Sequence, residues 1–539
     1  MVVCWHAGLG SHASYLLAGD VGNLWWHEEQ MTVTPPNKSD LPVIQHIPRL
    51  ETLLGQVQSV GQLPVQVSES SAGASKRCEL PVAQQATSRR AAPQPWEATR
   101  SHEVVKISQS ADQASRPLDD GFWFPVEPDS LVRAGLSEGA VEELILKCLN
   151  NQAEMTGRQL SEHTCLPFRV VEPLLASLKT DRLIAHKGAA MVNDYIYQLT
   201  ERGRERAKKL AELCAYASAA PVPLQDYIES VEFQSLSLQH PSRDDLCRAF
   251  SDMLIDEKML DRLGPAINSA CGLFLFGAAG NGKTSIAERI TRAFGQTIWI
   301  PRVIGINGET MRFYDPGSHE EAPLNANDGL VDERRVDARW VRIRRPTVVV
   351  GGELTMSSLE VTLNTATNVS EAPVQMKSNC GVLVIDDFGR QQMRTDQLLN
   401  RLIVPLDKRY DFLNLSGGKK IEVPFDQLIV FSTNLEPRDL VDEAFLRRIP
   451  YKIEVADPDE SEFRRLFEIA APAVGMEYDR EAVDYLIKTY YQQVNRPFRC
   501  CQPWDLLHQI ASYCRYLHKP AKMTPVYFDY AVENYFSVI

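Results

Sequence analysis

Apolar and polar residues alternate with regular periods from about residue 121 to the end of the chain. Between residues 136 and 215 the pattern predicts a helix, a pair of short helices, two strands and a final helix. Thr156 is placed to cap the second helix, and Pro167 to open the third. Apolar strands alternating with helices follow, and from residue 457 onward the spacing is helical. The pattern therefore predicts a small mixed unit, a longer α/β unit and a helical unit, in that order.

The N-terminal region, residues 1–115, differs in composition from the rest of the chain. It is rich in Ser, Ala, Gln and Pro, as in SESSAGASKR and QQATSRRAAPQPWEATRS, and no period is sustained in it. Segments of this kind bury too little apolar surface to offset the entropy lost on ordering. We therefore predict that residues 1–115 are mostly disordered. Because the residues before Met31 have an unusual Trp and His content, we also hypothesise that translation begins at Met31.

Composition and charge narrow the class of protein. Hydrophobic residues make up 44% and charged residues 24% of the chain, as in ordinary soluble domains. The net charge of −13 argues against a protein that coats nucleic acid, because such a protein needs a basic surface. A local basic patch is still compatible with this charge. Apolar runs are too short to cross a bilayer, and the first residues lack the basic start of a secretory signal. We therefore expect a cytoplasmic protein without a membrane partner.

The cysteines are scattered and form no CxxC pair. Cys500, Cys501 and Cys514 gather near His508, which leaves a metal site open as an alternative. Thiols that are buried or idle in a reducing compartment are the favoured interpretation of these residues. The expected metal site lies instead in the motifs described next.

The stretch GAAGNGKTS, residues 277–285, has the spacing of a loop that wraps around phosphates. The apolar strand GLFLFG ends at its first glycine, and SIAERITRAFG continues as a helix. In this context, backbone N–H groups of the loop face the phosphates of a nucleotide, and a chance glycine turn is the alternative. Lys283 is expected to reach the β- and γ-phosphates, and Thr284 to ligate Mg²⁺. The expected nucleotide-binding residues are Gly277, Gly280, Asn281, Gly282, Lys283, Thr284 and Ser285.

Two later strands end in polar residues that fit the same chemistry. CGVLVIDDFGR is an apolar strand followed by Asp386, expected to hold Mg²⁺ through its water shell, and Asp387, expected to orient or deprotonate the attacking water. DQLIVFSTNLEP is another apolar strand, and Asn434 at its end is placed to touch the γ-phosphate or the water. Turn chemistry alone also puts acids and Asn after strands. The order of the three motifs favours a site for ATP and Mg²⁺.

This order of motifs resembles the AAA+ ATPases over roughly residues 240–535. The resemblance implies an α/β P-loop NTPase core with a helical lid, in which GAAGNGKT is the Walker A loop, VLVIDD is Walker B and Asn434 is sensor 1. It also implies that VDEAFLRRIPYKIEV carries an arginine finger, which reaches the nucleotide of a neighbouring protomer and neutralises transition-state charge. Arg448 is the expected finger and Arg447 the second choice. A solvated helix end is the alternative for this pair.

Two positions depart from the AAA+ pattern. Many members of the family have Glu as the second Walker B acid where this chain has Asp387, but the initiator and helicase-loader branch also looks like IDD. At the sensor 2 position, in PWDLLHQI, the family usually places Arg, and this chain has Trp504, which cannot pair with a γ-phosphate. Arg499 or Arg496, just upstream, is a candidate substitute; otherwise we expect weakened hydrolysis. Trp504→Arg is then expected to raise nucleotide affinity or turnover.

The stretch between the two Walker motifs is longer than a minimal core needs. INGETMRFYDP, residues 306–316, predicts a hairpin that turns at NG. RWVRIRRPTVVVGG predicts a strand with basic residues around Trp340, which in one interpretation line a pore or hold nucleic acid. Alternation on a half-exposed strand, with Arg outward and Val or Ile inward, is the favoured interpretation. The basic residues are Arg339, Arg342, Arg344 and Arg345.

A second hairpin is predicted just before the sensor 1 strand, from YDFLNLSGGKKIEVPFD, residues 410–426. Some AAA+ branches have a hairpin here that projects into a central pore and moves substrate. By that resemblance Lys419 and Lys420 are pore candidates. A polar, glycine-containing hairpin tip without a function is the alternative.

The unit between residues 136 and 215 resembles a winged-helix domain. Its expected recognition helix, in LPFRVVEPLLASLKTDR, offers Arg169, Lys179 and Arg182. Readers of DNA sequence usually expose more base-reading and phosphate-binding groups than this mostly apolar helix, so protein docking is favoured and DNA binding stays open. With this unit and the inserted segments, the chain resembles an uncharacterised bacterial group of AAA-family ATPases.

The predictions combine into one organisation and one leading function. The expected parts are a disordered region 1–115, a winged-helix domain 116–218, a linker 219–241, an AAA+ α/β nucleotide-binding domain 242–456 and a helical lid 457–539. We expect an ATPase that forms a ring of identical subunits, with a hexamer as the working number, and remodels a protein or nucleoprotein client. An ATP-gated DNA-binding regulator with slow or no turnover, and a near-inactive nucleotide-binding scaffold, are the alternatives.

Overall fold

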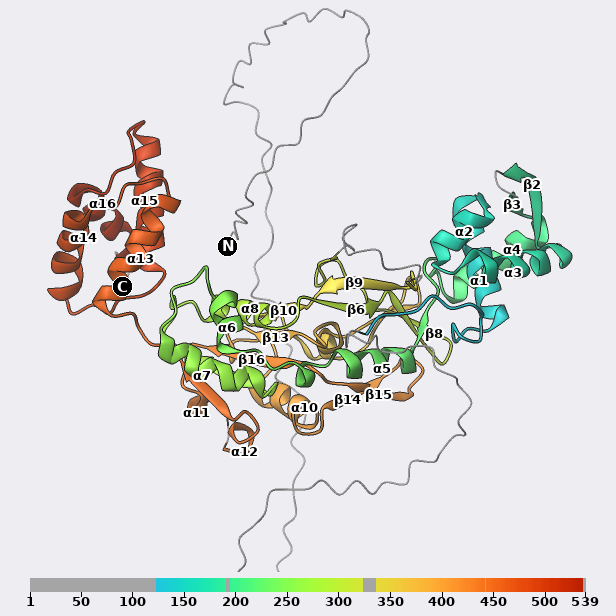
Figure 1. The fold of residues 1–539 in the computed structure, drawn as a ribbon, viewed down its shortest axis with the longest axis horizontal. Helices are drawn as coiled ribbons and strands as arrows, with labels where there is room; N and C mark the ends of the chain where they lie inside the picture. The colour runs from blue at the N-terminus through green and yellow to red at the C-terminus, as the bar shows by residue number, and fades with distance from the viewer. Residues whose placement is uncertain (1–122, 191–193, 323–335, 442, 537–539) are drawn as a thin grey trace, which may run out of the picture. The chain divides into compact units, whose positions relative to one another are not determined.

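The computed structural model describes residues 123–190, 194–322, 336–441 and 443–536 (Figure 1). All of them belong to one compact unit of the chain, Val104–Ile539. The predicted disorder of residues 1–115 and the hypothesis of a start at Met31 lie outside the described residues. Within the described ranges, every helix is too short or too polar to span a bilayer.

The first described unit packs helices around a three-stranded antiparallel sheet with the order β1-β3-β2. Thr156 caps α2, its hydroxyl accepting from the Gln159 amide at 3.1 Å, and Pro167 directly precedes α3, so both predictions are confirmed. The predicted element order is also confirmed, with β1 as an additional strand. The elements are α1 (Glu138–Gln152), β1 (Glu154–Thr156), α2 (Gly157–Thr164), α3 (Phe168–Thr180), β2 (Ile184–Ala190), β3 (Asp194–Leu199) and α4 (Glu201–Leu213).

The α/β unit is built on a five-stranded parallel sheet with the order β10-β13-β16-β5-β17. The strands predicted before the phosphate loop, the acid pair and Asn434 are confirmed as β5, β13 and β16. Because the strands are parallel, the residues that follow them meet at one edge of the sheet, where ligands of such folds bind. The strands are β5 (Leu273–Phe276), β10 (Thr347–Val350), β13 (Val382–Ile385), β16 (Leu428–Thr433) and β17 (Tyr451–Glu454).

Helices cover both faces of this sheet (Figure 1). Alternate residues of a strand point to opposite faces. One face, which includes Leu275 and Val384, packs with α6, α7 and α8, and the other, which includes Phe274 and Phe431, packs with α10. This two-sided burial explains why the strands are continuous apolar runs. The helices are α6 (Arg243–Ala249), α7 (Glu257–Asn268), α8 (Lys283–Ile290), α10 (Thr395–Lys408), α11 (Pro437–Leu440) and α12 (Glu443–Leu446).

The inserted segments form further sheets. A mixed sheet has the order β11-β12-β8-β7-β4, and the hairpin predicted for residues 306–316 is its β7–β8 pair, which turns at Asn307 and Gly308, both at positive φ. The hairpin predicted for residues 410–426 is the β14–β15 pair, and β6 pairs with β9. The strands are β4 (Val222–Pro223), β6 (Thr297–Pro301), β7 (Val303–Ile306), β8 (Glu309–Arg312), β9 (Trp340–Arg344), β11 (Thr362–Asn364), β12 (Val369–Glu371), β14 (Tyr410–Asn414) and β15 (Lys420–Pro424).

The segment predicted as a linker, residues 219–241, is instead part of the folded structure. It contains β4, which pairs with β7, and helix α5 (Leu224–Gln234). Tyr227 on α5 is fully buried, and its hydroxyl accepts a hydrogen bond from Asn379 Nδ2 at 2.8 Å. Pro223 precedes the first residue of α5, a place where its fixed φ suits the turn into a helix.

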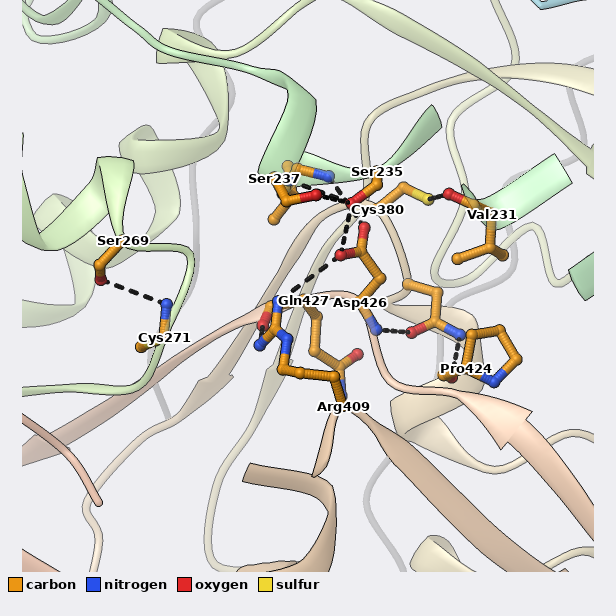
Figure 2. Close-up of polar contacts among 12 residues, drawn as sticks. Val231, Ser235, Ser237, Ser269, Cys271, Cys380, Arg409, Pro424, Asp426 and Gln427 are labelled. Carbon is orange, nitrogen blue, oxygen red and sulfur yellow. Dashed lines mark hydrogen bonds and ion pairs between the residues drawn. The ribbon is translucent and has the colours of Figure 1, made fainter. Parts of the chain in front are cut away.

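Asp426 joins this segment to the sheet (Figure 2). Its carboxylate accepts hydrogen bonds from the Ser235 hydroxyl and the Leu236 amide, both at 2.8 Å, and forms an ion pair with Arg409 at 3.5 Å. Its own amide donates to Asn379 Oδ1 at 2.9 Å. The residues that Asp426 connects are far apart in the sequence, so no local pattern could predict this contact.

The basic stretch around Trp340 differs from the single half-exposed strand that was predicted. It forms two strands in different sheets, β9 and β10. Trp340 is buried with its ring centroid 5.1 Å from that of Trp123. Arg344 is exposed and pairs with Glu320, and Arg342 is half-buried. The prediction that the arginines of this stretch point outward therefore holds for only some of them.

The prediction that Arg339 and Arg345 point outward is wrong, because both side chains are buried. Arg339 forms an ion pair with Asp337 at 2.7 Å and donates to the Ala134 carbonyl at 2.8 Å. Arg345 donates to the Cys380 carbonyl at 2.7 Å, and burial lowers its pKa. A guanidinium with several carbonyl and carboxylate acceptors can be buried. These two residues are therefore excluded from a pore or nucleic-acid surface.

The C-terminal unit is helical, as predicted from residue 457 onward. Its core is one apolar cluster that includes Phe463, Phe467 and Leu507. A single π-helical turn, Ile487–Gln492, interrupts the helical series. The helices are α13 (Glu460–Ala473), α14 (Arg480–Leu486), α15 (Gln502–Tyr516) and α16 (Pro525–Phe536).

Candidate functional site

The glycine-rich loop joins β5 to α8 and has a backbone that only glycine adopts without strain. Gly277 has φ +139°, and a Cβ there would lie 2.4 Å from the Val455 carbonyl oxygen. Gly280 has φ +86°, and a Cβ there would lie 2.5 Å from Cys501 Sγ. Gly282, also at positive φ, is the N-cap of α8. The loop therefore exposes backbone N–H groups at the start of a helix, the arrangement that binds phosphates.

Lys283 lies at the centre of the loop. Its ammonium donates to the carbonyls of Gly277 and Ala278, both at 3.0 Å, and to Asn434 Oδ1 at 2.6 Å. The residue is only 7% exposed. Burial lowers the pKa of Lys283, Asp386 and Asp387 raise it, and Arg499 lowers it further. Besides burial, the charges that act on this ammonium are those of Asp386, Asp387 and Arg499, which the sequence had already named as candidates.

Thr284 and Asp386 lie in direct contact. The Thr284 hydroxyl donates to Asp386 Oδ2 at 2.9 Å. A hydroxyl and a carboxylate at this spacing are oxygen donors of the type that Mg²⁺ prefers, and Mg²⁺ keeps several waters beside one or two protein oxygens. The pair therefore fits a magnesium ion that also binds phosphate oxygens. Ser285 is in the first turn of α8, and its carbonyl accepts from Arg289 Nη1 at 2.9 Å.

Asp387 and Asn434 complete the cluster. Asn434 Nδ2 donates to Asp387 Oδ1 at 3.3 Å, so one amide contacts both Lys283 and Asp387. Asp387 has φ +47°, an uncommon backbone conformation for a residue other than glycine. Gln391 Nε2 supports it by donating to the Asp386 and Asp387 carbonyls, at 2.9 and 3.2 Å. Such local strain gathers at functional sites.

The loop also contacts the helical unit. Asn281 is 2% exposed, and its Nδ2 donates to Asp457 Oδ1 at 2.7 Å. Asp457 in turn forms an ion pair with Arg499. The Cys501 amide donates to the Gly280 carbonyl at 2.9 Å. The residues just before α15 are therefore in contact with the glycine-rich loop, and Arg499 brings a cation to it.

The three candidates for the sensor 2 role have different surroundings. Trp504 lies on α15, packs against the apolar cluster of the helical unit and stacks on His508 with ring centroids 6.3 Å apart. Arg496 lies over the Phe536 ring at 3.6 Å and donates to the Tyr490 carbonyl at 3.2 Å. Arg499 is the one of the three that pairs with a residue bound to the loop.

Arg447 and Arg448 lie at the opposite end of the sheet strands from the loop. Both precede β17, which is parallel to β5, whereas the loop follows β5. A four-residue strand spans roughly 13 Å. Arg448 pairs with Asp407 at 2.7 Å, and Arg447 is exposed with its amide donating to the Glu443 carbonyl at 3.1 Å.

The other candidates are placed as follows. Lys419 and Lys420 are exposed at the tip of the β14–β15 hairpin. Arg169 pairs with Glu127 at 3.3 Å, Lys179 Nζ lies 3.4 Å from His186 Nδ1, and Arg182 is exposed. Within the described ranges, no three or more His, Cys, Asp and Glu residues lie together in a way that could hold a metal ion.

The thiols near the loop are free. Burial raises the pKa of Cys500 to about 11 and also raises the pKa of Cys501. Both shifts disfavour the thiolate near neutral pH.

Sequence reasoning missed Asp457, which connects Asn281 to Arg499. It lies three residues after the end of β17, the strand next to β5, so it reaches the same edge of the sheet. An acid after an apolar strand was the available signal, but the pairing of β17 with β5 was not predictable.

Comparison with known proteins gives limited matches. A family described as a domain of unknown function (DUF8689) matches residues 459–534. The search of curated proteins gave no match. Among solved structures, two variants of RuvB from Thermotoga maritima are 12% and 11% identical to this chain, with TM-scores of 0.32 and 0.30. Each match covers 53% of this chain, and the matches cover 71% and 70% of the two RuvB chains. NtrX from Brucella abortus is 13% identical with a TM-score of 0.32, covering 52% of this chain and 56% of its own.

Proposed function

We propose that this protein is an AAA+ ATPase that binds ATP with Mg²⁺ and hydrolyses it. One observation carries the proposal: the ends of three adjacent parallel strands bring Lys283, Asp387 and Asn434 into one hydrogen-bonded chain beside the Thr284–Asp386 pair. A glycine-rich loop, an oxygen-donor pair and a second acid are the parts that phosphoryl transfer to water needs.

Each residue has a distinct role in the proposed reaction. The loop amides and Lys283 bind the β- and γ-phosphates, and Thr284 and Asp386 hold the metal ion with its waters. Mg²⁺, when bound, neutralises phosphate charge. Asp387 orients the attacking water and accepts its proton, and Asn434 fixes the positions of Asp387 and Lys283 relative to each other. The γ-phosphoryl group passes to the water oxygen, and ADP leaves.

The position of Arg448 supports action on a neighbouring subunit. Because Arg448 precedes β17 and the loop follows the parallel strand β5, the side chain lies at the wrong end of the sheet for its own Lys283. Arg448 can therefore neutralise a γ-phosphate only in another copy. This supports a ring of identical subunits, for which a hexamer stays the working number.

The remaining parts are assigned by the same proposal. The domain boundaries predicted above are kept, except that residues 219–241 belong to the folded core. The unit with α1 to α4 is a winged-helix domain that recruits a protein or nucleoprotein client; the pairing of Arg169 with Glu127 favours a protein over DNA. We also propose a cytoplasmic location.

The test is the ATP hydrolysis rate per protomer of the purified chain, over a wide range of protein concentration. We expect a rate that rises with concentration and saturates, because each site is completed between subunits. Asp387→Asn should keep ATP binding and abolish turnover, whereas Lys283→Ala should lose binding. ATP binding with no turnover at any concentration would contradict the proposal and favour the ATP-gated DNA-binding regulator.

A further inference from the structure

Helices α15 and α16 form a pocket that the proposed nucleotide site does not use. Its volume is about 490 Å³, within the range of roughly 300–1,000 Å³ that small ligands occupy. It is lined by His508, Gln509, Ser512, Tyr513, Tyr516, Tyr530 and Asn534. Aromatic rings and neutral polar groups thus make up its wall, and no carboxylate is among them.

The aromatic rings of the pocket are arranged as stacking surfaces. Tyr513 and Tyr530 stack on each other with ring centroids 3.8 Å apart and an angle of 17° between their planes. Tyr516 is 79% exposed, so most of its ring is in contact with solvent. Gln509 Oε1 is buried and has no hydrogen-bond partner among the described residues. Flat, partly exposed rings suit a planar ligand that can stack on them.

Positive charge gathers at the C-terminal end of α15 and in the loop that follows it. Arg515, Lys519 and Lys522 are exposed on or just after α15, and none of them forms an ion pair with a described residue. The sequence contains no acid between Asp505 and Asp529. Asp529 itself accepts hydrogen bonds from the Tyr485 and Tyr490 hydroxyls, at 2.9 and 2.8 Å.

The nearest other acid on α16 is Glu533, which is exposed. The three cations outnumber Asp529 and Glu533, so this part of the helical unit is locally basic in a chain whose net charge is −13. A local basic face in an acidic protein marks a preference for an anionic partner.

We infer that this face of α15 and α16 binds single-stranded nucleic acid. Bases stack on Tyr516 and on the Tyr513–Tyr530 pair, and the phosphates follow Arg515, Lys519 and Lys522. Aromatic stacking combined with a cationic track is how proteins bind single strands without reading their sequence. A protein segment is the less favoured occupant, because the cations would then have no defined partner. The inference does not depend on ATP hydrolysis.

The test uses the full chain and a fluorescein-labelled oligothymidylate about 20 nucleotides long, followed by fluorescence anisotropy. We expect binding that weakens as salt rises, with a slope of log K against log salt of about −2, because three cations each contribute about −0.7. The same length of RNA should bind comparably, since stacking does not distinguish the sugars. A mononucleotide at the same concentration should compete poorly.

Variants locate the binding. Tyr516→Ala should weaken binding by about tenfold, whereas Tyr516→Phe should bind as the wild type does, because a phenyl ring still stacks. Lys519→Ala should make the salt slope shallower by about 0.7. Lys488→Ala, which removes an exposed lysine elsewhere in the helical unit, is the matched control and should change neither.

Two results would overturn the inference. One is absence of oligonucleotide binding at low salt, and the other is binding that Tyr516→Ala leaves unchanged. In either case the aromatic face would be assigned to a protein partner instead. Because Tyr516 is outside the proposed ATP site, Tyr516→Ala should leave basal ATP turnover unchanged, and the two proposals fail independently.

Discussion

The Lys283 ammonium donates to Asn434 Oδ1 at 2.6 Å, and the Asn434 amide donates in turn to Asp387 Oδ1 at 3.3 Å. An Asn side chain can make both contacts because its amide carries an acceptor and a donor at the same end. The amide at the end of β16 therefore orients a lysine and an acid that follow two different strands.

Asn434→Ala tests this connection. Because the amide positions groups that act in the reaction, we expect turnover to fall by about 10²-fold while ATP affinity changes little. Asn434→Asp is a sharper variant, since it keeps the acceptor for Lys283 but places a like charge against Asp387. It should also be slow. Steady-state turnover and ATP binding at equilibrium measure the two effects, and wild-type turnover in Asn434→Ala would refute the role.

If Arg448 is the arginine finger, its removal and the removal of its ion-pair partner Asp407 should affect turnover differently. Arg448→Ala should abolish turnover, and mixing it with a subunit that carries Lys283→Ala should restore part of the activity, because each variant supplies what the other lacks. Asp407→Ala removes the ion-pair partner of Arg448 but leaves its charge. It should keep turnover. If Arg448→Ala and Asp407→Ala lose activity equally, and mixing Arg448→Ala with Lys283→Ala restores none, the Arg448–Asp407 pair is structural.

The cation beside the loop predicts a role for Arg499. Arg499→Ala should weaken ATP binding by about tenfold, the scale of one lost charge-assisted contact. Trp504→Arg was expected from the sequence to raise affinity or turnover. Since Trp504 packs against the apolar cluster, we now expect Trp504→Arg to lower the melting temperature and to leave ATP affinity unchanged. Higher affinity in Trp504→Arg, with none lost in Arg499→Ala, would reverse the assignment.

Asp226 predicts a pH dependence of stability. Burial raises its pKa from the ordinary value to about 6, opposed by Arg339. The folded state therefore disfavours the carboxylate, so this contribution to stability is complete below about pH 4 and is lost as pH rises to about 6. Asp226→Asn should raise the free energy of unfolding at pH 7 by about 1–2 kcal/mol, with no gain at pH 4.

Asp252→Asn is the matched contrast in the same denaturation experiment. Hydrogen bonds and charge from Arg289 and Arg292 lower the pKa of Asp252 to about 2. Its contribution is present above about pH 4 and is lost as pH falls through about 2, so Asp252→Asn should destabilise the fold at pH 7. A gain in both variants would show that removal of negative charge in general, and not the burial of Asp226, sets the effect.

The local geometry of the candidate site is predictable where the motif is continuous. GAAGNGKTS specifies its own loop, because glycine at Gly277 and Gly280 is required by backbone conformations that other residues avoid. Asp386, Asp387 and Asn434 were found because each ends an apolar strand. Asp457 escaped, and Arg499 was named only as one of two substitutes for sensor 2, since their relation to Asn281 depends on which strand pairs with which.

The sequence by itself determined the elements and the order of the chemical groups, because periodicity and turn residues act within a few positions of the chain. The hairpins at residues 306–316 and 410–426 and the cap at Thr156 are of this kind. Only the tertiary structure decided the rest. It buried Arg339 and Arg345, folded residues 219–241 into the core and gathered Asp426 with Ser235. Those outcomes depend on partners distant in sequence, whose proximity is set by packing and is absent from any local pattern.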